Sequence, residues 1–273
     1  MAAELTAESV AMIELINAYS VGIVNTQMRE VSKNIEAEEG LGTATALQRS
    51  GRQMLLTAGH VVQGASASHL QFMPKPTAVT CFGDTKEYAN RLALAVRRPF
   101  PVVEIVQCEW ADLAVLLLDC AIVRHEDARY VQFYKWDSEH CSPEVGSLLH
   151  GLGHPVDKTY LVTERQLDNH IARDLGVSKQ IISCEVVPND RGKYIKGFDP
   201  EICFLVDYAS VAIDGKPHGF SGCGFWEYRE NMETLWTVRP RFAGVETSYA
   251  ESSNLLLTIR PEVISKWLLE IGL

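Results

Sequence analysis

The stretch that decides how this chain is interpreted runs from residue 214 to residue 226 and reads DGKPHGFSGCGFW. At its centre, Ser221 is flanked by Gly219 two positions before it and by Gly222 directly after it. A serine in such a turn presents its hydroxyl group, and Gly219 can take a backbone conformation that is barred to other residues. The amides of Gly219 and Ser221 can then point at one spot and stabilise a developing oxyanion. A motif this short also occurs by chance, so its meaning depends on segments upstream.

Two upstream segments supply the groups that an activated serine needs. Residues 54–62 read MLLTAGHVV, an apolar strand that ends in small residues and His60. Residues 110–118 read WADLAVLLL and place Asp112 at the head of an apolar run. We therefore expect a buried carboxylate there, which needs a hydrogen-bonding partner such as an imidazole. In nucleophilic acyl transfer a histidine takes the proton of the serine hydroxyl, and an aspartate orients the histidine.

The order of these residues along the chain discriminates between the folds that host this chemistry. The α/β-hydrolases place the histidine last, but no histidine follows Ser221, and subtilisins place the aspartate first, but no aspartate precedes His60. The order His60, Asp112, Ser221 resembles that of the trypsin-like serine peptidases, over about residues 20–260. The resemblance implies an all-β fold of two six-stranded antiparallel barrels with short helices at both ends. It also implies a serine endopeptidase with this catalytic triad and with the Gly219 and Ser221 amides as oxyanion hole.

Several positions depart from the family's pattern. Phe220 stands where secreted trypsins have the aspartate that pairs with a new N-terminus, and Cys223 replaces a small residue. In these respects the chain is closer to the bacterial, HtrA-like branch. The resemblance assigns the substrate-binding wall to Gly215, Lys216, His218, Thr247 and Tyr249. Because Gly215 carries no charge where trypsin selects basic side chains, we expect a neutral side chain before the scissile bond, although Lys216 or Glu246 could add a charge.

Other assignments remain open. The same fold could serve as a catalytically silent binding module, and the same site could act as an esterase. Cys223 would be the nucleophile only if Ser221 were not, and Asp119 is a weaker candidate for the orienting acid. His150 and His154 have a spacing seen in metal sites, but the two glycines between them argue against a helix that presents both. We expect no metal and no cofactor.

Composition bounds the partners and the compartment. The chain has 273 residues, a net charge of −10 and no Lys/Arg cluster, which argues against binding to nucleic acid. Its 7 cysteines are odd in number and follow no framework spacing, which favours a reducing compartment. The first residues lack the features of a secretory signal, and no apolar run reaches the roughly 18 residues of a membrane span. We therefore expect a cytoplasmic protein that acts on a protein or peptide substrate.

Residue patterns predict a helix over 5–18, a second over 260–271, and many short strands between them. Predicted strands lie at 19–25, 40–47, 53–57, 70–73, 78–82, 88–96, 101–106, 112–118, 145–152, 160–163, 181–187, 202–206, 224–228, 235–238, 243–246 and 255–259. We divide the chain into a first barrel with the N-terminal helix (1–122), a linker (123–143) and a second barrel with the C-terminal helix (144–273). Polar residues 168–196 are expected to be surface loops.

Regulation follows from Phe220, because this residue cannot make the buried ion pair that matures a trypsin zymogen. Control would then come from narrow specificity, from loops that order only on substrate or partner binding, or from a regulatory protein partner. The stretches 168–196 and 215–220 are the candidate loops. We expect a protein with an intact N-terminus that is weakly active alone and is stimulated by a partner.

Overall fold

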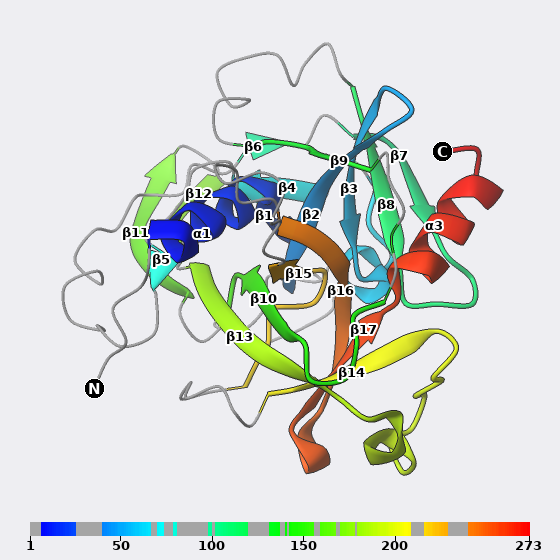
Figure 1. Ribbon diagram of the computed structural model, residues 1–273. Coiled ribbons are helices and arrows are strands. Elements are labelled where there is room, and N and C mark those ends of the chain that lie inside the picture. Colours follow the sequence, from blue (N-terminus) through cyan, green and yellow to red (C-terminus); the bar gives the residue numbers. More distant parts are fainter. Residues whose placement is uncertain are drawn as a thin grey trace.

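Antiparallel strands in two large sheets make up most of the protein, with one helix near each end (Figure 1). The structure is a computed structural model. It describes residues 7–25, 40–66, 70–73, 79–80, 98–99, 102–119, 131–136, 140, 142–155, 159–167, 170–177, 179–208, 216–228 and 240–273. The strands expected at 88–96 and 235–238 lie outside these residues.

The first sheet contains the strand that precedes His60 and the strand that follows Asp112. Its order is β6-β4-β1-β2-β3-β8-β7, and β9 pairs in parallel with β2. The strands are β1 Ser20–Asn25, β2 Gly40–Arg49, β3 Arg52–Thr57, β4 Leu70–Met73, β6 Arg98–Pro99, β7 Val102–Gln107, β8 Ala114–Leu118 and β9 Tyr134–Lys135. A tight turn joins β2 to β3, with positive φ at Ser50 and Gly51. The short 3-10 helix Gly59–Val62 follows β3 directly.

The second sheet closes on itself. β10 pairs with β15 on one side and with β13 on the other, which gives a six-stranded antiparallel barrel in the order β10-β15-β16-β17-β14-β13. Its strands are β10 Leu148–Gly153, β13 Lys179–Val187, β14 Cys203–Asp207, β15 Gly224–Tyr228, β16 Pro240–Ala250 and β17 Leu255–Ile259. The two-residue strand β5 Val79–Thr80 adds to β13 in parallel. Short 3-10 helices occupy Asn189–Gly192 and Glu251–Ser253.

The prediction of a chymotrypsin-like, mostly β fold is confirmed, with one difference between its two halves. The second half forms the expected six-stranded barrel, whereas the described strands of the first half form an open path in an eight-stranded sheet. The domain boundaries remain a prediction. The described part of the predicted linker contributes β9 to the first sheet, so it is packed structure and not only a connection.

The prediction that residues 168–196 are surface loops is wrong. β11 Thr159–Leu167 and β12 His170–Val177 form a separate two-stranded hairpin, and β13 begins at Lys179. Figure 1 shows the hairpin beside α1. The polarity of this stretch misled the prediction, because paired strands satisfy their backbone groups whatever side chains they carry.

Apolar side chains fill three main regions. One lies inside each half, and the third lies between the halves and takes residues from both helices. β3 illustrates the division: Leu55 packs inside the first half, while its neighbours Met54 and Leu56 face the shared region. This alternation is the period of two that a strand imposes on its side chains. Both faces of β3 are therefore buried.

The two helices cover the shared region. α1 (Ala7–Tyr19) contributes Met12 and Ile16, and α3 (Pro261–Glu270) contributes Ile264 and Trp267. Pro261 occupies the first turn of α3, where its missing N–H leaves no intrahelical bond unmade. Neither helix is long and apolar enough to cross a membrane, among the residues that the structure describes.

Candidate active site

His60 and Asp112 come together beside the start of β8. Nδ1 of His60 lies 2.7 Å from Oδ2 of Asp112, and the His60 backbone N–H donates to Oδ1 at 2.9 Å. Gly59 permits this approach, because a Cβ at its position would lie 2.9 Å from Oδ1 of Asp112. The carboxylate therefore holds the ring and the backbone of the histidine together. That arrangement leaves Nε2 of His60 to accept a proton from a third group.

The prediction of a buried carboxylate at residue 112 is wrong. The side chain of Asp112 is 41% exposed and that of His60 is 45% exposed, since Asp112 lies in the turn that precedes β8. Partial burial works against ionisation of Asp112, but hydrogen bonds from His60 and Gly59 and the charge of His60 outweigh it. The pKa of Asp112 is therefore lowered below its usual range. The carboxylate stays ionised at neutral pH.

The turn around Ser221 leaves two of its amides free. Phe220 N–H donates to the Pro217 carbonyl at 3.1 Å, Gly222 N–H to Glu246 at 2.7 Å, and Cys223 N–H to Phe220 at 2.6 Å. Among the described residues, no acceptor receives the N–H of Gly219 or of Ser221. Gly219 has φ +95°, a conformation that favours glycine. These two amides are the ones that the sequence singles out for an oxyanion hole.

The described residues contain no hydrogen bond between Oγ of Ser221 and His60, so the third link of a triad is not made in this structure. Ser221 itself is partly exposed. Unliganded sites can have long or misaligned catalytic hydrogen bonds that tighten only with substrate. The structure thus holds a formed histidine–aspartate pair and a separate serine turn.

Phe220 is buried and 1% exposed. Its ring fills the space over Gly153, where an added Cβ would lie 2.6 Å from the Phe220 ring. Phe220, the residue before the serine, is thus held by apolar packing, whereas the aspartate at this position in secreted trypsins is held by an ion pair. Cys223 is also buried, and burial raises the pKa of its thiol well above the ordinary value. A protonated thiol is a poor nucleophile.

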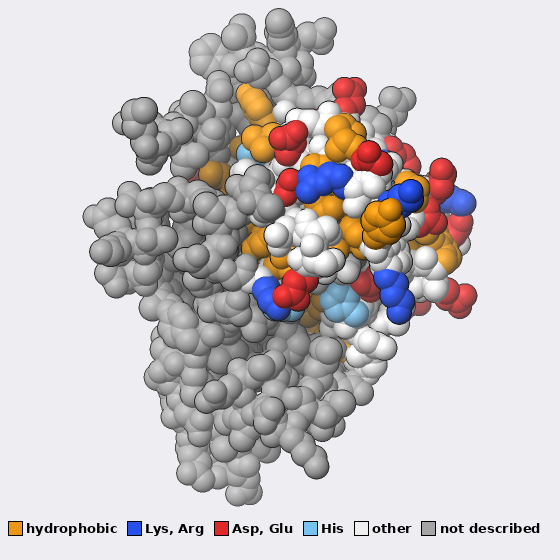
Figure 2. All heavy atoms as spheres, turned by 90° about the horizontal axis from the view of Figure 1, so that it is seen from below, with side chains coloured by type: hydrophobic (Ala, Val, Ile, Leu, Met, Phe, Trp, Pro, Cys, Tyr) orange, Lys and Arg blue, Asp and Glu red, His pale blue; other side chains and the backbone are white. Residues whose placement is uncertain are grey.

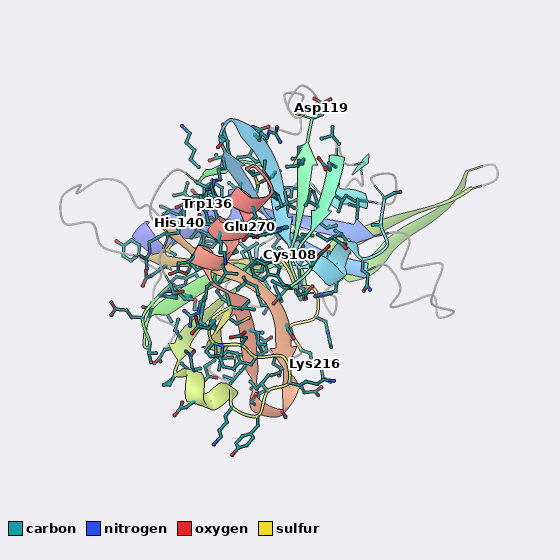
Figure 3. The ribbon with its side chains drawn as sticks, turned by 90° about the vertical axis from the view of Figure 1, so that its right-hand side faces the viewer. Cys108, Asp119, Trp136, His140, Lys216 and Glu270 are labelled. Carbon is teal, nitrogen blue, oxygen red and sulfur yellow. The ribbon has the colours of Figure 1, made fainter. Side chains whose placement is uncertain are left out.

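The residues predicted to bind substrate have different environments. Lys216 and His218 are exposed, and Nζ of Lys216 lies 2.6 Å from Oε1 of Glu251. Thr247 is buried in β16, while the hydroxyl of Tyr249 donates to Asn254 at 2.6 Å. Figure 3 shows Lys216 at the right-hand side of the lower half of the molecule. Gly215 lies outside the described residues.

Sequence analysis left the face of Glu246 open. Its side chain is 1% exposed, and its Oε2 atom is buried without a hydrogen-bond partner among the described residues. Burial raises its pKa to about 8, and the negative charge of Asp112 adds to the effect. The backbone of Glu246 pairs with Gly222 and Cys223, directly after the serine. The carboxyl group is therefore neutral at pH 7 and lies behind the serine turn.

Lys179 is a second buried charged residue whose burial was not predicted from the sequence. The Lys179 ammonium is buried and donates to Asn17 Oδ1 at 2.9 Å and to the Ser20 carbonyl at 2.8 Å, at the junction of α1 and β1. Burial lowers its pKa to about 7. A lone lysine in a polar stretch gives no sign of burial, so no sequence signal could have found it. It joins the second barrel to the N-terminal helix.

Three other described histidines, His140, His150 and His154, lie in different surroundings. Nδ1 of His150 lies 2.8 Å from Oγ of Ser183, and His154 is buried near Thr43. His140 lies beside Trp136, with 4.2 Å between ring centroids, next to α3 (Figure 3). The described residues contain no cluster of three or more possible metal ligands. Asp119, the weaker candidate acid, follows the far end of β8 (Figure 3).

No family model and no curated protein sequence matches the chain. Solved structures do match. The scabies mite inactivated protease paralogue S-I1 superposes with a TM-score of 0.54 at 15% identity, over 95% of this chain and 96% of its own. The corresponding paralogue S-D1 gives 0.56 at 12% identity, over 94% of each chain. Human heparin binding protein gives 0.51 at 12% identity, over 92% of this chain and 90% of its own.

These similarities establish the fold of the protein. The chain has the chymotrypsin-like fold along nearly its whole length, with a sequence far from those of the structures that share it. Two of these structures are named as inactivated proteases. At this level of identity the comparison defines the fold, and activity has to be argued from this chain's own residues.

Proposed function

We propose that this protein is a serine hydrolase of the chymotrypsin-like fold that cleaves peptide bonds through an acyl-enzyme. The observation that carries the proposal is the hydrogen-bonded pair of His60 and Asp112, together with a serine turn in which the amides of Gly219 and Ser221 have no acceptor among the described residues. Ser221 attacks the carbonyl carbon, and its proton passes to Nε2 of His60. The proton then goes to the leaving amine, and water releases the acyl group by the same path in reverse.

Each residue has a distinct task in this scheme. Asp112 keeps the proton on Nδ1 of His60, so that Nε2 is free to act as a base. The amides of Gly219 and Ser221 stabilise the negative charge that develops on the carbonyl oxygen, and each such donor contributes roughly 3–4 kcal/mol. The same residues would hydrolyse an ester, which makes an esterase a variant of this proposal. The proposal also includes that this protein is related to the bacterial, HtrA-like branch of these peptidases.

The second candidate is a catalytically silent binding module. Two observations favour it: Ser221 and His60 are not hydrogen-bonded in the described residues, and two of the matched structures are named as inactivated proteases. In this case the surface around Ser221 would bind a protein without cleaving it. Figure 2 shows part of the described surface, where acidic and basic side chains are interspersed with apolar ones.

A fluorophosphonate probe separates the two candidates, because it reacts with a serine only where a base and an oxyanion hole activate that serine. The hydrolase predicts covalent labelling of the wild type at Ser221, and no labelling of Ser221→Ala or of His60→Ala. Mass spectrometry of the labelled peptide locates the adduct. A folded wild type that does not react would support the binding module. Labelling that persists in Ser221→Ala would move the nucleophile to another residue.

A further inference from the structure

Thr43, a residue of β2 in the first sheet, makes hydrogen bonds to the serine turn of the second barrel. Its Oγ1 donates to the Gly219 carbonyl at 2.8 Å, and its backbone N–H donates to the Ser221 carbonyl at 2.9 Å. Thr43 is fully buried. It therefore binds the carbonyls of the two residues whose amides are free. The catalytic scheme proposed above gives no task to Thr43 or to these two hydrogen bonds.

The position of Thr43 is itself fixed by its neighbours. The hydroxyl of Thr57 donates to the Thr43 carbonyl at 2.7 Å, and the backbone N–H of His154 donates to Oγ1 of Thr43 at 3.1 Å. A hydroxyl has one proton, and here that proton goes to Gly219. Its oxygen accepts from the residue that follows β10. Thr43 is therefore held by both halves of the protein and is not free to rotate away.

Backbone packing between β2 and the serine turn is equally tight. A Cβ at Gly222 would lie 1.9 Å from the Thr43 carbonyl oxygen and 2.3 Å from Oγ1 of Thr57. Only glycine allows this approach. Thr45, two residues along β2 on the same face, donates to the Gly222 carbonyl at 3.3 Å. Thr43 and Thr45, on one face of β2, therefore contact the serine turn both before and after Ser221.

We propose that Thr43 is a positioning residue for the oxyanion hole and acts through its side-chain hydroxyl. Fixing the Gly219 carbonyl fixes the plane of the peptide that follows Gly219, because the peptide unit is rigid. Phe220 N–H, at the other end of this peptide, already donates to Pro217. This held peptide connects the two peptide units that carry the amides of Gly219 and Ser221, so it restricts the rotation of both amides away from the spot where the oxyanion forms. Catalysis needs this preorganisation before substrate arrives.

This role suits a chain that has Phe220 before its serine. A buried phenylalanine packs without direction, so it does not by itself select one orientation of the neighbouring peptides. A hydrogen bond from Thr43 is directional and does select one. The oxyanion turn is then set by the contact between the two halves and needs no new N-terminus. The inference rests on the proposed serine hydrolase.

The test compares Thr43→Val, which keeps the shape and removes the hydroxyl, with Thr43→Ser, which keeps the hydroxyl. We expect the labelling rate with a fluorophosphonate, and kcat on any cleaved peptide, to fall about 10-fold to 100-fold in Thr43→Val, with KM unchanged. Thr43→Ser should stay within about 3-fold of the wild type. The matched control is Thr258→Val, because Oγ1 of Thr258 is equally buried and has no hydrogen-bond partner in the part of the chain that the structure describes. That variant should keep full activity.

Each outcome separates the inference from the function on which it rests. A wild type that is never labelled overturns the serine hydrolase and this inference together. A labelled wild type with an equally reactive, folded Thr43→Val overturns this inference alone, as does a Thr43→Ser that loses as much as Thr43→Val. If Thr43→Val does not fold, a crystal structure of the phosphonylated wild type decides. Its phosphonyl oxygen should accept from Gly219 and Ser221 with the Thr43–Gly219 bond intact, and a broken bond refutes the role.

Discussion

Asp112 binds His60 at two points: Oδ2 lies 2.7 Å from Nδ1 of the ring, and Oδ1 accepts the backbone N–H at 2.9 Å. Asp112→Asn keeps the size of the side chain but places a donor where the ring needs an acceptor, so the ring takes the wrong tautomer. We expect kcat to fall by about 10⁴-fold, as a change of this kind does in such triads, with the fold retained. Steady-state kinetics and circular dichroism measure both effects.

The control for this change is Asp119→Asn, at the other end of β8. It alters the same residue type on the same strand without touching His60. Activity should remain near that of the wild type. A loss at residue 119 comparable to the loss at residue 112 would show that the charge near this sheet matters in general and that the specific contact with His60 does not.

Glu246 makes the stability of the folded protein depend on pH between about 4.5 and 8. Its pKa in the folded protein is about 8, whereas its ordinary value is 4.5, so between these values the folded state holds a proton that the unfolded state has released. Its contribution to stability is therefore complete below about pH 4.5 and is lost as the pH rises through 8. Each pH unit in this window costs at most about 1.4 kcal/mol.

The variant Glu246→Gln removes this titration and keeps the shape of the side chain. Its free energy of unfolding should change less between pH 5 and pH 8 than that of the wild type, with the gap widening as the pH rises. Urea denaturation at several pH values measures the difference. Parallel pH profiles for the two proteins would mean that Glu246 is ionised in the folded state.

Gly222 and Gly51 have similar positive φ values of +91° and +76° but different surroundings. A Cβ at Gly222 meets the Thr43 carbonyl, while a Cβ at Gly51 meets nothing within 4 Å. Gly51→Ala should cost only the backbone strain, about 1–2 kcal/mol. Gly222→Ala adds a steric clash in the interface, so we expect a loss above about 4 kcal/mol and no labelling of Ser221. Equal destabilisation by the two substitutions would show that the interface yields easily.

Four described cysteines are free, and three of them, Cys184, Cys203 and Cys223, are buried. Burial raises the pKa of each of these thiols, to about 11 for Cys203. Thiolates are the reactive form, so iodoacetamide at neutral pH should modify the partly exposed Cys108 before these three. Peptide mapping after brief treatment of native protein gives the order. If alkylation of Cys223 were accompanied by rapid loss of labelling at Ser221, the Cys223 thiol would again be a candidate nucleophile.

The identities and order of the chemical groups were readable from the sequence. His60, Asp112 and Ser221 stand in local contexts that mark them individually, such as a strand ending in His60 and glycines around Ser221. Strand alternation and turn glycines are also local and predicted many short strands, while the chymotrypsin-like fold was implied by the resemblance of the three ordered motifs to the trypsin-like peptidases. Polar segments were harder to predict, as the hairpin of β11 and β12 shows, because backbone pairing between strands does not require apolar side chains.

The tertiary structure decided everything that depends on which distant residues meet. It placed Asp112 in an exposed turn instead of the core, paired Lys216 with Glu251, and buried Glu246 behind the serine turn. It brought Thr43 to Gly219, 176 residues away in sequence. The sequence determines which hydrogen-bond donors and acceptors are present in the chain. Which of them meet is set by the packing of the two halves around a shared core, since hydrogen bonds act over a few ångströms of space whatever the separation along the chain.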